Sequence, residues 1–358
     1  MDRSGILYAV VEAETGGDEE LPQDERALDP VVVDALERRL DELTGTRWEI
    51  VGVEKAATGH VNGTLLLDAR PRPVVVKVQS DTVAVYGSDP ILEPLVLREL
   101  GAAGAPVPAV VAVDGDPSTL GSPWFAMERI DGVGLPDDAF TGFMAEGWFF
   151  ESTTARRRRV CETFVDCLAR VHAVPAAALS GHDRAGSASA MIDYLRASVE
   201  DGAPGQVPRE HRLLDRLAAE LPVGADDDVT PCMGDSRMAN ALVRGGEVVA
   251  LVDWEIAYLG NPAADIGYAV NNVNWLVHAT GTRLDGIPTA DETWDRWESL
   301  TGRRVPAADR RYWERFGALV ITVTATRVIA SFLTGPDDPG PEDVNSMLTY
   351  AEGLFDVR

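Results

Sequence analysis

The chain has 358 residues, of which 45% are hydrophobic and 25% charged, a composition typical of a globular protein with a sizeable buried core. This length suits two folding units, or one large one, and excludes a small peptide scaffold, while the composition argues against a wholly disordered chain. The 58 acidic residues outnumber the 32 basic ones and give a formal net charge of −26, which argues against nucleic-acid backbones and anionic membranes as main partners.

The cysteines and the apolar segments bear on location. The three cysteines form no CxxC pair, and the N-terminus lacks the basic and apolar regions of a secretory signal, so we expect a cytoplasmic protein without a zinc site. The longest apolar stretch, residues 316–333, contains Arg327, whose charge would be costly at the centre of a bilayer. We therefore interpret this stretch as a buried helix.

The first third of the chain predicts a β-rich unit. Residues 1–28 are acidic and contain paired glycines, and we expect them to be mobile. Asp29 and Pro30 are typical of a helix start, and Gly45 of a helix end. Short β-branched runs separated by Gly and Pro then predict strands around one further helix. The expected strands cover 48–53, 64–67, 74–78, 109–113 and 124–130, and the helix covers 90–100.

Helical patterns dominate the remainder. The expected helices cover 156–172, 189–198, 209–221 and a set between 291 and 354, with short strands at 241–243 and 248–252. The order predicts an α+β protein with a mainly antiparallel β part over 29–130 and a larger, mainly α part over 131–358.

The most informative segment runs from Pro231 to Asp253. Gly234 and Asp235 open a loop that can project a carboxylate, and Asn240 supplies an amide oxygen five residues later. Asp253 directly follows the apolar strand 248–252, which would hold it rigidly. Oxygen donors of this kind suit Mg²⁺, which is usually shared with substrate phosphates.

This Asp-x4-Asn pattern followed by Asp resembles the protein-kinase-like superfamily, in the aminoglycoside phosphotransferase and choline kinase branch. The resemblance implies a two-lobed kinase-like fold with ATP and Mg²⁺ between the lobes. It also implies that Asp235 is the catalytic base, that Asn240 and Asp253 bind Mg²⁺, and that Arg237 faces the transferred phosphoryl group. The alternatives are that the acidic residues cap turns and that Arg237 is a surface or paired cation.

The β-rich part contains the residues that such an ATP site needs. Lys77 lies in the apolar strand 74–78 of a chain with only two lysines, and Glu93 follows sixteen residues later on a predicted helix. By resemblance, Lys77 binds the α- and β-phosphates and Glu93 positions it, while the alternative for Lys77 is an edge residue that reaches solvent.

Two further segments resemble nucleotide contacts of the branch. The loop containing Gly59, Asn62 and Gly63 resembles its phosphate-covering loop, because glycines let backbone amides approach a phosphate closely. A hairpin turn is the alternative. The strand ending in Met127, Glu128 and Ile130 resembles the hinge whose backbone binds adenine.

Supporting residues also follow the pattern, with one departure. Asp265, at the end of Gly260–Asp265, resembles the Asp that braces the catalytic loop through backbone amides. Met233 stands where the branch usually has His. This departure leaves open the alternative that the enzyme is weakened or inactive. The five histidines lack ligand spacing and are interpreted as structural or surface residues. The aromatic segment 140–150 is interpreted as core packing, with a cover over the acceptor pocket as the alternative.

The combined reading is an ATP- and Mg²⁺-dependent phosphotransferase that acts on a hydroxyl of a small molecule, aminoglycoside-like or another metabolite. A cationic acceptor would suit the acidic chain. The alternative is a weak or inactive kinase-like module that binds nucleotide and acts through a protein partner. The sequence does not select the acceptor, the oligomeric state, or ATP over GTP.

Overall fold

A computed structural model of the protein describes residues 29–55, 63–79, 92–137, 140–179, 186–202, 207–332 and 341–356. The chain divides into two compact units. The first comprises residues 1–98, 108–129 and 332–338, and the second comprises 99–107, 130–331 and 339–358. Residues 1–28 lie outside the described residues.

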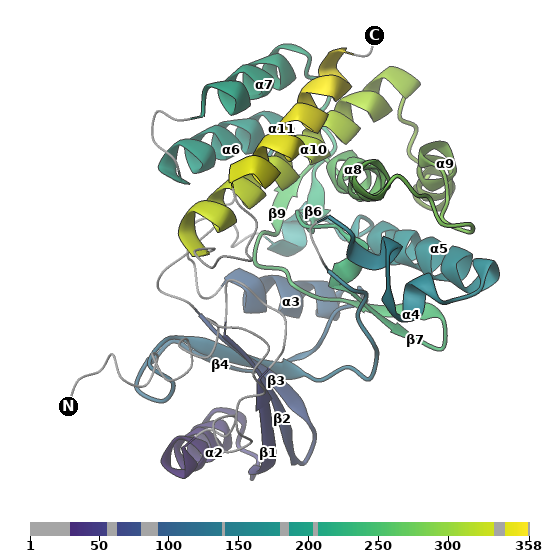
Figure 1. Ribbon diagram of the computed structural model, residues 1–358. Coiled ribbons are helices and arrows are strands. Elements are labelled where there is room, and N and C mark those ends of the chain that lie inside the picture. The colour runs from purple at the N-terminus through teal and green to yellow at the C-terminus, as the bar shows by residue number, and fades with distance from the viewer. Residues whose placement is uncertain are drawn as a thin grey trace. The chain divides into compact units, whose positions relative to one another are not determined.

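The first unit is built on one antiparallel sheet of five strands in the order β1-β2-β3-β5-β4, which confirms the predicted antiparallel β part (Figure 1). The strands are β1 (Glu49–Lys55), β2 (Gly63–Arg70), β3 (Val74–Val78), β4 (Val110–Asp114) and β5 (Trp124–Glu128). Helix α3 (Leu92–Ala102) begins in this unit and ends in the second.

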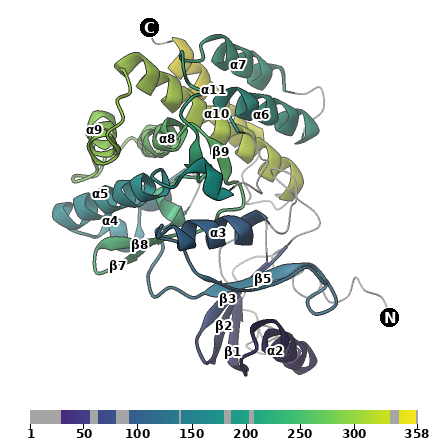
Figure 2. The same ribbon diagram turned by 180° about the vertical axis from the view of Figure 1, so that it is seen from behind.

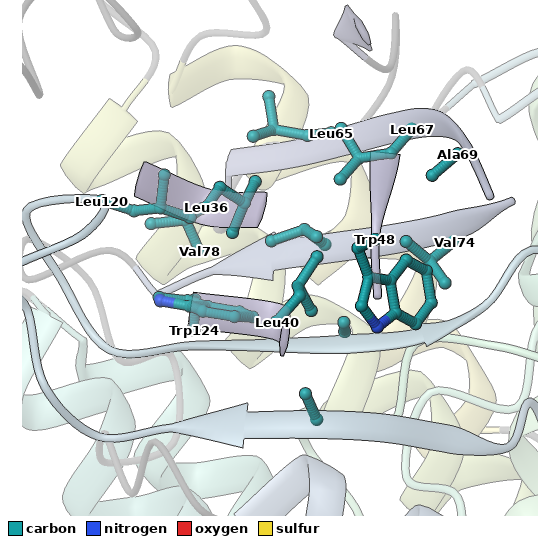
Figure 3. Close-up of a cluster of buried hydrophobic side chains, with 13 residues drawn as sticks. Leu36, Leu40, Trp48, Leu65, Leu67, Ala69, Val74, Val78, Leu120 and Trp124 are labelled. Atoms are coloured by element: carbon teal, nitrogen blue, oxygen red, sulfur yellow. The ribbon is translucent and has the colours of Figure 1, made fainter. Parts of the chain in front are cut away.

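Helix α2 (Pro30–Thr44) begins and ends where the sequence predicts. The Asp29 side chain accepts a hydrogen bond from the Val31 amide, and Gly45 ends the helix with φ 66°. Leu36 and Leu40 of α2 pack into a buried cluster with Trp48 and the inward side chains of the strands (Figure 3). Arg39 extends this attachment through a paired contact with the Asp114 carboxylate at 2.8 and 3.0 Å.

The second unit is mainly helical (Figure 2). Its longer helices are α5 (Thr154–Val171), α6 (Ala188–Gly202), α7 (Pro208–Ala219), α8 (Ala263–Thr280), α9 (Ala290–Thr301), α10 (Ala307–Phe332) and α11 (Pro341–Asp356). Two small antiparallel pairs accompany them, β6 (Thr230–Cys232) with β9 (Tyr258–Gly260) and β7 (Ala241–Arg244) with β8 (Glu247–Leu251). Among the described residues no helix is long and apolar enough to cross a membrane.

The aromatic segment lies in this unit and forms two short turns, η3 (Gly142–Met144) and α4 (Gly147–Phe150). Phe143 and Phe149 are fully buried and meet edge to face at 5.1 Å. The Trp148 indole donates to the Gly134 carbonyl and lies under the Arg156 guanidinium. Core packing, the first interpretation of this segment, therefore holds for Phe143 and Phe149, whereas Trp148 is half-buried and Phe150 is 39% exposed.

Candidate active site

A tight turn after β6 carries Asp235. Gly234 has φ +82°, and a Cβ atom there would lie 2.4 Å from the Ile256 carbonyl oxygen, so the turn requires glycine. The Asp235 side chain is 14% exposed and therefore keeps access to solvent. Three residues later the chain enters the short helix η5 (Met238–Asn240).

Asp265 in the first turn of α8 holds this turn from behind. Its two carboxylate oxygens accept hydrogen bonds from the Met233 amide at 2.7 Å and the Gly234 amide at 3.0 Å. Its backbone carbonyl accepts from the Ser236 hydroxyl at 2.7 Å. These contacts confirm the predicted bracing role of Asp265, and they fix the backbone on both sides of Asp235.

A buried histidine supports this brace in turn. His172 Nε2 lies 3.0 Å from Asp265 Oδ2, and the Trp297 indole nitrogen lies 3.0 Å from His172 Nδ1. Because an indole nitrogen can only donate, Nδ1 accepts and the ring proton is on Nε2, which donates to Asp265. His172 is thus structural, as interpreted from the sequence.

Both oxygens of the Asp235 carboxylate have neighbours. The Tyr268 hydroxyl donates to Oδ1 at 2.5 Å, and Arg237 Nε lies 3.0 Å from Oδ2. Arg237 also donates through Nη1 to the Asp137 carboxylate at 3.0 Å. The structure therefore shows Arg237 in an ion-pair group, and its expected contact with a phosphoryl group stays a prediction.

The charge of Arg237 is secured by this setting. Burial alone would lower the pKa of its guanidinium, but the carboxylates of Asp235 and Asp137 outweigh burial and hold that pKa above its usual range. The charge of Asp253 acts in the same direction, so Asp253 lies close enough to influence this group. A permanent cation therefore stands beside the candidate base.

The β7–β8 hairpin brings the two expected metal ligands to its open end. Ala241 pairs with Leu251, and the Val252 amide donates to the Asn240 carbonyl at 2.9 Å, so Asn240 and Asp253 flank the same end of the ladder. The Asn240 side-chain nitrogen donates to the Asp235 carbonyl at 3.1 Å. This contact fixes the orientation of the Asn240 amide and leaves its side-chain oxygen as the atom that could bind a metal ion.

An Asn–Asp oxygen pair fits Mg²⁺ better than it fits a softer metal. Within the described ranges no group of three His, Cys, Asp or Glu side chains could hold a metal ion. Two protein oxygens are nevertheless a common share for Mg²⁺, which keeps several waters and takes its other ligands from substrate phosphates. The donor set is therefore compatible with a metal that arrives with a nucleotide.

In the first unit Lys77 and Glu93 form the expected pair. The Lys77 ammonium lies 3.0 and 2.8 Å from the two Glu93 carboxylate oxygens, and both residues are buried. The alternating directions of β3 explain the contact: Val74, Val76 and Val78 belong to the cluster beneath α2, so Lys77 points to the opposite face. There it meets the first turn of α3.

The remaining nucleotide-contact candidates are only partly described. Gly59 and Asn62 lie outside the described residues, and Gly63 begins β2 opposite Val78. Met127 is buried within β5, and the Glu128 amide already donates to the Ala109 carbonyl at 2.8 Å. Ile130 follows the strand and is half-buried.

Two residues of the site were missed by the sequence reasoning. Tyr268 was detectable in principle, because it lies three residues after Asp265 and so shares a helical face with it. Asp137 carries no comparable signal, since it lies a hundred residues before its partner Arg237 in a segment without periodicity. The structure alone brings it to the site.

Comparison with known proteins identifies related sequences. The model of the phosphotransferase enzyme family matches residues 57–300. Acyl-CoA dehydrogenase family member 10 of Mus musculus is 27% identical over 250 residues, covering 66% of this chain and 22% of that protein. Probable acyl-CoA dehydrogenase IBR3 of Arabidopsis thaliana is 26% identical over 276 residues, covering 70% of this chain and 32% of that protein. The chain thus spans less than a third of the length of these relatives.

Solved structures share the fold. A candidate aminoglycoside phosphotransferase from Ralstonia eutropha has a TM-score of 0.66 at 21% identity, covering 90% of this chain and 95% of that one. A thermostable mutant of the aminoglycoside phosphotransferase APH(4)-Ia, in complex with AMP-PNP and hygromycin B, has a TM-score of 0.56 at 15% identity, covering 89% and 97%. A choline/ethanolamine kinase family protein from Mesorhizobium loti has a TM-score of 0.54 at 15% identity, covering 91% and 95%. These matches agree with the predicted kinase-like fold.

Proposed function

Because this chain belongs to the phosphotransferase enzyme family, we propose that it transfers the γ-phosphoryl group of ATP to a hydroxyl of a small molecule. The observation that carries the proposal is the Asp235 turn, which is braced through backbone amides yet leaves the carboxylate partly exposed. A general base must be fixed in direction and reachable by the proton it takes.

In the proposed reaction Asp235 accepts the proton of the acceptor hydroxyl. The hydroxyl oxygen forms a bond to the γ-phosphorus, the bond between that phosphorus and the oxygen of the β-phosphate breaks, and ADP leaves. Arg237, which lies beside Asp235, would offset the charge of the transferred group. Lys77, paired with Glu93, would hold the phosphates.

Mg²⁺ would be held by the Asn240 oxygen and the Asp253 carboxylate, and when bound it offsets phosphate charge. The bound nucleotides in related structures, AMP-PNP in one and ADP in another, support ATP as the donor. Gly59, Asn62 and Gly63 remain the proposed phosphate-covering residues, and Met127, Glu128 and Ile130 the proposed adenine contacts.

The acceptor is proposed only as a small hydroxyl compound. Hygromycin B in a related structure makes an aminoglycoside-like acceptor one candidate. The acidic helix α9 gives little support to a cationic one, since Asp295 and Glu298 are both paired with Arg310 at 2.8 and 2.9 Å. Glu292 caps α9 and binds Arg158.

The rival proposal, a nucleotide-binding module without catalysis, depended on Met233. That side chain is fully buried, and only its backbone amide contacts the brace. A methionine without exposed surface fills space in the interior and offers no polar group to a substrate. Its presence therefore does not favour loss of activity.

The test is Mg²⁺-dependent ATP turnover across a panel of hydroxyl acceptors, with Asp235→Asn as the key variant. Asn keeps the shape but loses the charge, so we expect turnover to fall about 10²–10⁴-fold while the thermal stabilisation by ATP persists. Met233→His is the control and should change the rate little. Parent-like turnover in folded Asp235→Asn would refute the proposed base, and activity gained only in Met233→His would favour the rival.

A further inference from the structure

Tyr268 controls one of the two oxygens of the Asp235 carboxylate. Its hydroxyl donates to Oδ1 at 2.5 Å, a length typical of a strong hydrogen bond to a charged oxygen. Tyr268 is 6% exposed, so solvent cannot readily replace this contact. Asp265 and Tyr268 lie on one face of α8. The same helix thus holds the backbone of the turn through Asp265 and the Asp235 side chain through Tyr268.

The position of Tyr268 is set by close packing of α8 on α10. A Cβ atom at Gly317 would lie 2.4 Å from the Tyr268 Cα, and one at Gly267 would lie 2.2 Å from the Trp313 carbonyl oxygen. The two helices can approach this closely because both positions are glycine. The hydroxyl of Tyr268 is therefore presented from a rigid backbone rather than from a loop.

The other oxygen, Oδ2, is differently placed. Arg237 Nε lies 3.0 Å away, but it forms no hydrogen bond to any residue in the described part of the chain. The Arg237 guanidinium is instead held through Nη1 by Asp137. Oδ2 thus lies beside a cation and still keeps a lone pair that can accept a hydrogen bond from an incoming hydroxyl.

We propose that Tyr268 is a positioning residue, which fixes the Asp235 side chain so that Oδ2 takes the proton of the acceptor. This inference rests on the proposed function and adds a defined atom to it. With Oδ1 bound to Tyr268, the carboxylate cannot rotate about its terminal bond without losing that hydrogen bond. The reactive oxygen is therefore selected before any substrate arrives.

The experiment compares Tyr268→Phe with Tyr350→Phe, using Mg²⁺-ATP with water as the acceptor. The Tyr350 hydroxyl donates to Asn271 on the same helix at 3.2 Å, so its removal matches the chemical change away from Asp235. We expect Tyr268→Phe to lower kcat about tenfold with the KM for ATP unchanged, as for loss of one hydrogen bond to a charged group. Tyr350→Phe should leave both constants unchanged.

The double variant Tyr268→Phe with Asp235→Asn separates positioning from general damage. If Tyr268 acts through Asp235, adding Tyr268→Phe to Asp235→Asn should cost nothing further. Equal losses in both backgrounds, or a parent-like kcat in Tyr268→Phe, would overturn the inference and leave the proposed function standing. A parent that turns over ATP neither with water nor with any acceptor of the panel, or an Asp235→Asn variant with the parent rate, would remove the proposed function and this inference with it.

A spectroscopic readout tests the contact without turnover. A hydroxyl proton in so short a contact should give a far-downfield proton NMR signal in the parent. The signal should disappear in both Tyr268→Phe and Asp235→Asn and remain in Tyr350→Phe. Its persistence in Tyr268→Phe would assign it to another group and contradict the inferred contact.

Discussion

Asp253 has φ +67° and is the sole non-glycine residue with positive φ in the described part of the chain. The left-handed region is unfavourable for a side chain with a Cβ, although Asp tolerates it better than most residues. A residue held in this way at the end of a strand is typical of a site where function, rather than stability, selects the side chain.

Asp253→Gly should therefore separate stability from binding. Glycine removes the unfavourable Cβ contact, so we expect the free energy of unfolding to rise by about 1 kcal/mol or to stay unchanged. The extra thermal stabilisation by ATP that depends on Mg²⁺ should disappear, because glycine has no carboxylate. Thermal unfolding with ATP, in the presence and absence of Mg²⁺, measures both effects. A variant that retained the Mg²⁺-dependent part would contradict the metal assignment.

The three cysteines should be chemically inert in the folded protein. Burial raises the pKa of the Cys161 thiol to about 12, that of Cys167 to about 11, and that of Cys232 well above its usual range. At pH 8 a thiol with pKa 11 is only about 0.1% thiolate, which is the reactive form. An aromatic disulfide reagent should thus label no cysteine at pH 8 in native protein and all three after unfolding in guanidinium. Rapid labelling of native protein would contradict this assignment.

The reactive residues of the candidate site were easier to propose from sequence than the residues that hold them. Asp235, Asn240 and Asp253 occur at short, fixed spacings, so a local pattern contains them. Tyr268 and Asp137 act through single hydrogen bonds from distant segments. Asp137 has no sequence signal that distinguishes it from an ordinary polar residue. Tyr268 has only its helical spacing from Asp265, which places it on the same face of α8 but does not show its contact with Asp235.

At the scale of elements, helix α8 is the main omission of the sequence reasoning. It runs from Ala263 to Thr280 and contributes both Asp265 and Tyr268. Its buried residues occur all around the helix because it is packed on several sides, so the polar and apolar faces that reveal an exposed helix are absent. Gly267 and the asparagines of this segment also weaken its helical propensity. By contrast, α2 has one apolar face and was predicted to within a residue at its C-terminal end.

The crossing of α8 and α10 gives a prediction for Gly317. Gly317→Ala should force the helices apart, because the new Cβ would lie 2.4 Å from the Tyr268 Cα, and should cost about 1–3 kcal/mol in the free energy of unfolding. Gly353→Ala on α11 is the matched control, since no atom lies within 4 Å of its Cβ position. That variant should be stabilised by about 0.5–1 kcal/mol through helix propensity. Urea unfolding measures both, and equal effects would contradict the packing argument.

For the whole molecule, the predicted order of the β-rich and the helical part along the chain agrees with the structure. A β-rich part precedes a helical part, and the kinase-like fold matches solved structures. The ion pairs that join distant segments were not predictable, because pairs such as Arg296 with Asp166 and Arg303 with Asp228 follow no local spacing. A chain with many arginines and more carboxylates offers numerous combinations, and only packing selects among them.

The support of the Asp235 turn also has a consequence for synthesis on the ribosome. All five strands of the first unit's sheet have been translated by Glu128, and the Lys77–Glu93 pair with them. The turn itself is translated much later, and its contact with Tyr268 lies a further 33 residues downstream. Its deeper support requires Trp297, whose partner His172 was made 125 residues earlier. A nascent chain can therefore complete the sheet while the turn is still unsupported, and the geometry of the candidate site forms only once α8 and α9 have left the exit tunnel.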